Sequence, residues 1–231
     1  MKDYAVTVTG TSPAGTTRSG TANIHVYDFG ITAAVSPASP AYACTFTPAP
    51  CLYVLSTGSN WYGVNAQLLP GSSVIGLPQV GLTLTGAPSG TLYSYTPNQG
   101  TPTFASNLTL TTTNTLPGSY TLTVMATDSR PEGGFRSIPV SLVVVTPQQA
   151  LQLVLNQVSA FQAGGAINKG QANALTVKLD QVIAYLNSGN TKNACLQMSA
   201  FSNKGFLTPQ ESSLLLGGPL GVYAVMKSLS C

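Results

Sequence analysis

The chain of 231 residues is long enough for one large domain or two ordinary domains, each with its own core. Hydrophobic residues make up 43% of it but charged residues only 6%, against about 25% in an average soluble domain. The formal net charge is +3, and its few basic residues are dispersed, which excludes the concentrated basic face of a nucleic-acid-binding protein. No apolar run approaches the ~20 residues of a membrane-spanning helix.

The few titratable residues are unevenly placed. The 99 residues of Phe29–Thr127 contain no Asp, Glu, Lys, Arg or His. General acid–base catalysis and metal binding need such groups to converge in a pocket. The single histidine, His25, falls in the middle of a predicted strand. We therefore expect a protein that is not an enzyme, with no catalytic residue, no metal site and no cofactor.

The chain begins with an alternating segment that recurs near its middle. Tyr4–Thr11 is echoed by Tyr120–Thr127 at an offset of 116 residues. Both copies continue through a turn to an Arg-Ser pair, which begins at Arg18 in one and at Arg136 in the other, and then to a second alternating strand. Apolar residues that alternate with Thr, Asn or Ser indicate strands with one buried face. Each copy is therefore predicted to be a β-hairpin.

Short β-rich runs separated by Gly and Pro lie between the two copies, and this spacing predicts an all-β sandwich. The runs are Leu52–Ser56, Trp61–Leu69, Val80–Thr85, Thr91–Tyr95 and Thr103–Leu110. We expect residues 28–146 to form one sandwich whose last two strands are the second copy. Residues 1–27 would then be the last two strands of a preceding, truncated sandwich, and a targeting segment for secretion would lie outside this sequence.

Two segments resemble the immunoglobulin-like repeats of secreted and cell-surface proteins of bacteria and archaea. One is the G-x-Y-x-L/V-T-V-x-A/G-T strand, here Gly118–Thr127, which leads through a hairpin into a closing strand. The other is the Asp-Phe opening of the next domain, Asp28–Pro37, directly after the first copy. The resemblance implies an immunoglobulin-like sandwich, and in such sandwiches a Trp such as Trp61 packs in the core.

The hydrophobic period changes from 2 to 3.6 after Pro147, which predicts a small all-α helical bundle over residues 147–231. Leu151, Leu155, Val158 and Phe161 share one face of a first helix, and a second helix follows Gly164-Gly165. A third is expected over about residues 191–203. Thr208–Glu211 is a capping box with Pro at the first helical position, so a fourth helix begins there. Gly217–Pro219 ends it and leaves a last helical piece.

The helical segment resembles the FIMAH domain, a small helical module at the C-termini of many secreted archaeal and bacterial hydrolases. Ile167–Leu179 carries the resemblance, which continues through Asn187–Asn190 to Ala194 and Phe201 and covers about residues 148–227. The chain departs from the family in having Cys195 and Cys231 and in the Gly-Gly-Pro break. The resemblance implies an accessory module attached to enzymes, without catalytic residues of its own.

The four cysteines form two local candidate pairs, Cys44 with Cys51 and Cys195 with Cys231. Neither pair has C-x-x-C spacing near a histidine, so zinc and c-type haem are not expected. An even number of cysteines in a charge-poor chain favours two disulfides and an extracellular or cell-surface location. The alternative is four buried thiols.

Two groups of residues are candidates for binding. Asp28, Asp128 and Glu132 could form a calcium site or a partner contact at a junction between modules, although backbone carbonyls would have to complete the 6–8 oxygens, roughly, that calcium prefers. The alternative is a solvated turn with paired charges. Tyr93 and Tyr95 lie on one face of a predicted strand, where they could stack on sugar rings; otherwise their rings are buried.

These observations favour a non-catalytic C-terminal accessory region of a secreted or cell-surface multidomain protein. Its expected roles are spacer, attachment or substrate targeting, with a polysaccharide or the cell envelope as partner. The alternative is a structural subunit of an extracellular filament, in which the N-terminal strands pair with a neighbouring copy, because open strand edges are templates for pairing.

Overall fold

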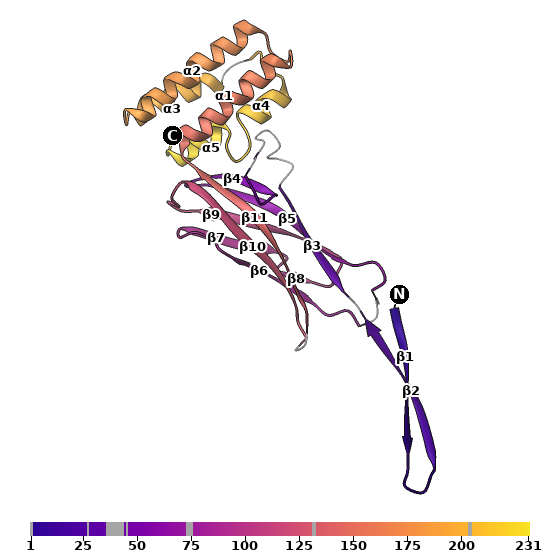
Figure 1. The fold of residues 1–231 in the computed structure, drawn as a ribbon. Helices are drawn as coiled ribbons and strands as arrows, with labels where there is room; N and C mark the ends of the chain where they lie inside the picture. The colour runs from indigo at the N-terminus through magenta and orange to yellow at the C-terminus, as the bar shows by residue number, and fades with distance from the viewer. Residues whose placement is uncertain are drawn as a thin grey trace.

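The computed structural model describes residues 2–26, 28–35, 44, 46–72, 76–130, 133–202 and 205–231. The chain forms three successive parts, with a long two-stranded hairpin at one end, two β-sheets in the middle and helices at the other end (Figure 1). Strands therefore occupy the first part of the chain and helices the second, as the change of hydrophobic period predicts.

The middle part consists of two sheets. The first has the strand order β4 (Cys51–Leu55), β11 (Phe135–Val145), β10 (Gly118–Asp128), β6 (Val80–Thr85) and β8 (Gln99–Gly100). The second has the order β3 (Phe29–Val35), β5 (Ser59–Leu68), β9 (Phe104–Thr112) and β7 (Thr91–Thr96). Neighbouring strands are antiparallel except for β4 and β11, which are parallel. Side chains from both sheets form one core, and we call residues 28–146 the sandwich.

Trp61 does not lie in this core, contrary to the prediction. It is half-buried, whereas the adjacent Tyr62 is fully buried and its hydroxyl donates a hydrogen bond to the carbonyl oxygen of Ser141 at 2.5 Å. Successive side chains of a strand point to opposite faces, so only one of two adjacent aromatic residues can face the core. In β5 the even-numbered residues from Asn60 to Ala66 are the buried ones.

Five helices lie in the described part of residues 147–231. They are α1 (Pro147–Ala163), α2 (Lys169–Asn187), α3 (Thr191–Ser202), α4 (Pro209–Leu215) and α5 (Val222–Ser228). The predicted capping box at Thr208 and Glu211 is present, and similar boxes start α1 at Thr146 and α2 at Asn168. None of the helices in the described residues is long and apolar enough to cross a membrane.

The helices pack on the sandwich through β4 and β11. In β11, Leu142 and Val144 face the sandwich core, whereas Val143 and Val145 join the core of the helices. In β4, Leu52 lies in the sandwich core and Leu55 in the core of the helices. Strands with both faces covered read as continuous apolar runs, which explains the Leu-Val-Val-Val sequence at the end of β11. The two parts are therefore joined by packing as well as by the chain.

The N-terminal hairpin consists of β1 (Lys2–Thr11) and β2 (Thr17–Val26), which pair antiparallel in a sheet of their own. It projects away from the sandwich (Figure 1). Its apolar side chains are exposed: Val8 is 64% exposed, Tyr4 50% and Ile24 49%. A two-stranded sheet alone is marginally stable in water, so contacts within the hairpin contribute little to its stability.

Candidate functional site

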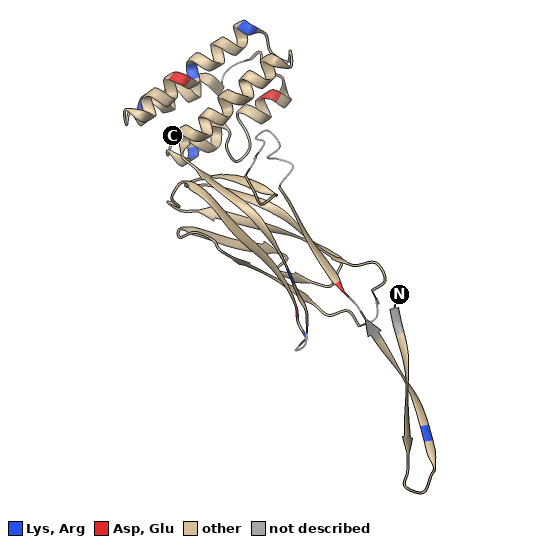
Figure 2. Cartoon of the chain, in the orientation of Figure 1, with Lys and Arg blue, Asp and Glu red and all other residues tan. Residues whose placement is uncertain are grey.

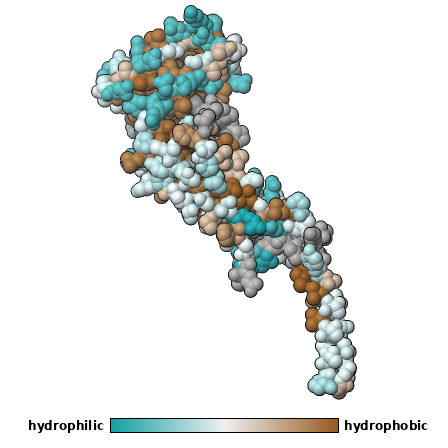
Figure 3. Space-filling model, in the orientation of Figure 1, coloured by the Kyte–Doolittle hydropathy of each residue, from teal (hydrophilic) through white to brown (hydrophobic). Residues whose placement is uncertain are grey.

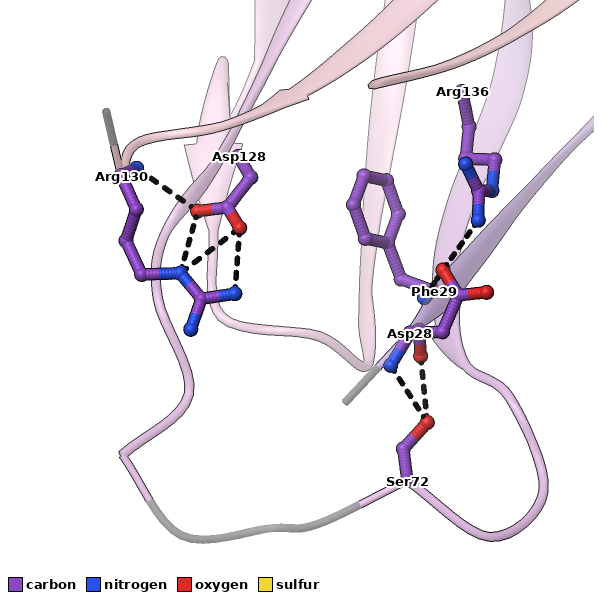
Figure 4. Close-up of polar contacts among 6 residues, drawn as sticks. All are labelled: Asp28, Phe29, Ser72, Asp128, Arg130 and Arg136. Atoms are coloured by element: carbon purple, nitrogen blue, oxygen red, sulfur yellow. Dashed lines mark hydrogen bonds and ion pairs between the residues drawn. The ribbon is translucent and has the colours of Figure 1, made fainter. Parts of the chain in front are cut away.

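The junction between the hairpin and the sandwich is held by Asp28. Its carboxylate accepts a hydrogen bond from the Arg136 guanidinium at 2.6 Å, and Arg136 also lies over the Phe29 ring, 6.0 Å from its centroid (Figure 4). The backbone N–H of Asp28 donates to the Ser72 hydroxyl at 2.9 Å, and that hydroxyl donates to the Asp28 carbonyl at 2.8 Å. Thus β11 and a loop after β5 fix the residue at which the chain enters the sandwich.

Asp128 belongs to a different contact, although it lies at the same end of the sandwich (Figure 4). Its side chain is buried, and it accepts bonds from the backbone N–H of Arg130 at 2.9 Å and from the Arg130 guanidinium at 2.8 Å. The predicted third member, Glu132, lies outside the described residues. Each described carboxylate of the candidate calcium site therefore faces its own arginine. No group of three His, Cys, Asp or Glu side chains lies together among the described residues.

Tyr93 and Tyr95 lie on the same face of β7, as predicted from their spacing. Their rings meet edge to face, with centroids 6.2 Å apart and planes at 78°. Tyr93 is 46% exposed, whereas Tyr95 is partly buried and donates from its hydroxyl to the carbonyl oxygen of Thr83 at 3.0 Å. Burial raises the pKa of Tyr95. The two rings do not form one flat platform, so sugar stacking stays a prediction for Tyr93 alone.

Both predicted disulfides are present. Cys44 pairs with Cys51, and Cys195 pairs with Cys231, each with 5.6 Å between the Cα atoms. The second bond joins α3 to the last residue of the chain, so it restrains the segment that follows α5. The first joins Cys44, which lies between β3 and β4, to the first residue of β4.

A cavity of about 580 Å³ lies where the sandwich meets the helices, a site that the sequence did not indicate. It is lined mostly by short polar and apolar side chains, among them Thr57, Ser59, Thr111, Asn114 and Ser228. Lys227 is the one charged residue of this lining in the described part of the chain. The lining comes from the ends of β4, β5 and β9, from α5 and from adjoining loops. These segments are far apart in sequence, so no local motif could have revealed it.

The hairpin matches β10 and β11 residue by residue. Tyr4 pairs across the hairpin with Ile24, and Tyr120 pairs with Leu142 in the sandwich. With the same correspondence the next in-facing pairs, Val6–Ala22 and Leu122–Val140, also match. In the sandwich Leu122, Val124, Val140 and Leu142 are completely buried. The same face of the hairpin, covered in one copy, is exposed in the other.

The position of one arginine matches as well. Gly10 pairs with Arg18 in the hairpin, and Ala126 pairs with Arg136 in the sandwich. Charged residues are rare in the β part of the chain (Figure 2), so an arginine at the same register position in both copies is informative. The repeated Arg-Ser pair was the signal in the sequence, but it did not reveal Asp28 as the partner of Arg136.

No protein-family model matches the chain, and no curated protein does. Solved structures match parts of it, among them a FixG-related protein from Vibrio parahaemolyticus, with TM-score 0.35 and 11% identity over 50% of this chain and 95% of that one. The fibronectin(III)-like modules of Clostridium thermocellum CbhA match with TM-score 0.25 and 10% identity over 63% of each chain. The D00-D0 domain of intimin matches with TM-score 0.27 and 12% identity over 61% of this chain and 64% of that one.

Proposed function

We propose that this chain is a non-catalytic accessory region of a secreted or cell-surface multidomain protein. It would serve as a spacer, an attachment segment or a targeting module. It combines an immunoglobulin-like sandwich with a FIMAH-like helical module. The location is supported by the two disulfides, because disulfides persist in oxidising compartments.

The immunoglobulin-like assignment is supported by strand order. The order β3-β5-β9-β7 corresponds to strands A, B, E and D of an immunoglobulin domain, and β6-β10-β11 corresponds to C, F and G. A second support is Tyr120, near the start of β10, whose hydroxyl donates to the carbonyl oxygen of Leu116 at 2.8 Å. This contact has the form of the tyrosine corner, which lies at the start of strand F in immunoglobulin-like domains.

One observation carries the proposal: the hairpin repeats β10 and β11 while its apolar face lies open. We infer that residues 1–27 are the closing strands of another sandwich. The two sandwiches would then follow each other through Asp28, and the helices would follow the second one through Thr146. A row of modules joined end to end suits a protein that spans distance outside the cell.

A second candidate function is a filament subunit, in which the hairpin pairs with a neighbouring copy. The same exposed face favours it, because open edges and apolar faces are templates for association. Analytical ultracentrifugation of the full chain over a range of concentrations distinguishes the two. We expect a monomer. Concentration-dependent polymers that disappear in the Val8→Lys variant would instead support the filament.

The targeting role has its own test. Sedimentation of the full chain with insoluble polysaccharides and with isolated cell envelopes measures binding directly. Binding that is lost in Tyr93→Ala but kept in the matched Leu92→Ala variant, on the other face of β7, would assign it to Tyr93. Absence of binding to all of them would leave the spacer role.

A further inference from the structure

The second copy of the repeat, in the sandwich, shows what kind of surface covers the face that the hairpin exposes. In the sandwich, β10 and β11 bury an apolar face, pair through β10 with β6 and pair through β11 with β4. The hairpin presents the matching apolar face, and neither of its outer strand edges pairs with another strand of the described residues. Hydrophobic surface is visible on the half of the hairpin nearer the sandwich (Figure 3). The hairpin therefore offers the surfaces that a sandwich without its last two strands lacks.

Arg18 indicates a charged group that the partner of the hairpin would carry. Arg136, its counterpart, pairs with Asp28 and lies over Phe29, at the beginning of strand β3. Arg18 is exposed and has no carboxylate partner among the residues that the structure describes. The matching partner would thus offer a carboxylate followed by an aromatic ring.

Tyr4 indicates a hydrogen-bond acceptor that the same partner would carry. Its counterpart Tyr120 donates to the carbonyl oxygen four residues earlier in the chain, that of Leu116. Tyr4 is 50% exposed, and its hydroxyl has no partner among the described residues. A strand connection that reaches Tyr4 from a preceding sandwich would supply that carbonyl.

We propose that the hairpin closes a β-sandwich whose first strand opens with a carboxylate and an aromatic residue, and that Arg18 and Tyr4 lock it in place. The inference rests on the proposed function, which assigns the hairpin to another sandwich, and it adds the chemistry of the partner. The apolar face drives the docking, since burial of such side chains is the main favourable term in strand packing. Arg18 and Tyr4 fix the register.

The test extends the full chain with a second copy of its own strands. Residues 28–117 are placed ahead of Lys2, so that Pro117 precedes Lys2 and Leu116 stands four residues before Tyr4. In this extended chain the hairpin can close the added strands. A control chain places residues 28–145 ahead of Asp28, so that the added copy is closed by its own β10 and β11. The control shows whether the added strands fold in this position.

Hydrogen–deuterium exchange read by mass spectrometry reports closure. We expect the backbone amides of β1 and β2 to exchange on the order of 100-fold more slowly in the extended chain than in the parent. Arg18→Ala and Tyr4→Phe should each lower the melting temperature of the added sandwich by about 2–4 °C, and neither should change the melting of the parent. Asp28→Ala in the added copy should weaken the extended chain less when Arg18→Ala is already present, because only the hydrogen bond from the Phe29 backbone N–H then remains to be lost.

The outcomes separate the two proposals. A hairpin that exchanges as fast in the extended chain as in the parent, while the control chain folds, overturns both the assignment to a sandwich and this inference. A hairpin that becomes protected but is insensitive to Arg18→Ala and Tyr4→Phe overturns this inference only. Protection together with sensitivity to both variants supports both.

Discussion

The hydroxyl of Tyr120 donates a hydrogen bond to the carbonyl oxygen of Leu116 at 2.8 Å and thereby fixes the chain where it enters β10. Tyr4 stands at the corresponding position of the hairpin, but it has no such acceptor among the described residues. The same repeat position thus holds a tyrosine with this hydrogen bond in one copy and without it in the other. Comparing Tyr120 with Tyr4 therefore tests what the hydrogen bond contributes.

Tyr120→Phe removes the donor and keeps the ring. We expect the free energy of unfolding to fall by about 1 kcal/mol, because a typical hydrogen bond contributes about that much. Tyr4→Phe in the same chain should change it by less than about 0.5 kcal/mol, as is usual for exposed positions. Urea denaturation followed by circular dichroism measures both. Equal effects would contradict the assignment of Tyr120 to a stabilising corner.

The two disulfides should differ in what they contribute. A disulfide restricts the unfolded chain more when it closes a longer loop, and the sequence separations are 36 for Cys195–Cys231 and 7 for Cys44–Cys51. We expect Cys231→Ser to lower the free energy of unfolding by about 3–4 kcal/mol and Cys44→Ser by about 2 kcal/mol.

Differential scanning calorimetry under oxidising conditions measures both changes. The double variants Cys195→Ser/Cys231→Ser and Cys44→Ser/Cys51→Ser serve as controls for any effect of the remaining free thiol. A larger loss from Cys44→Ser than from Cys231→Ser would contradict the prediction.

The ion pair between Asp28 and Arg136 should contribute little to stability. Both side chains are nearly half exposed, 47% and 44%, and exposed pairs contribute at most about 1 kcal/mol. A double-mutant cycle with Asp28→Ala and Arg136→Ala should give a coupling energy below about 1 kcal/mol that declines as salt is added. A larger coupling, or one that salt does not reduce, would contradict this prediction.

Much of the fold could be predicted from the sequence because the local signals are strong. Thr208 and Glu211 predicted a helix start that is present, and Val80–Thr85 was predicted as a strand with the bounds that β6 has. The alternation in Tyr4–Thr11 and Tyr120–Thr127 predicted both hairpins. Signals of this kind depend on neighbouring residues alone.

The remaining features depend on contacts between distant residues. Trp61 was expected in the core, but Tyr62 lies there because of which face of β5 turns inward, and nothing local sets that choice. The partner of Asp28 is Arg136, 108 residues away, and their pairing follows only from the placement of β3 near β11. The packing of the helices on β4 and β11 also depends on contacts between distant residues. The apolar run in β11 was its one local signal, because such a run is typical of a strand with both faces covered.

Tyr62 should make the stability of the sandwich depend on pH in alkaline solution. Its hydroxyl lies between the sheets, and burial raises its pKa above the ordinary tyrosine value of about 10. Below about pH 10 the phenol is protonated in both the folded and the unfolded chain, so it adds no pH dependence. As the pH rises further, the unfolded chain loses this proton while the folded chain keeps it. Stability therefore falls with increasing pH.

Tyr62→Phe should remove this part of the slope, which is about 1.4 kcal/mol per pH unit for one proton. The free energy of unfolding, measured with urea between neutral pH and the alkaline limit of folding, gives the slope for each chain. The slope is the relevant readout, because the variant also loses the hydrogen bond to Ser141 and is destabilised at every pH. Val64→Ala, which weakens the packing of the same strand without removing a phenol, is the control and should keep the slope of the parent. Parallel curves for the parent and Tyr62→Phe above about pH 10 would show that the buried phenol does not set the alkaline limit of this fold.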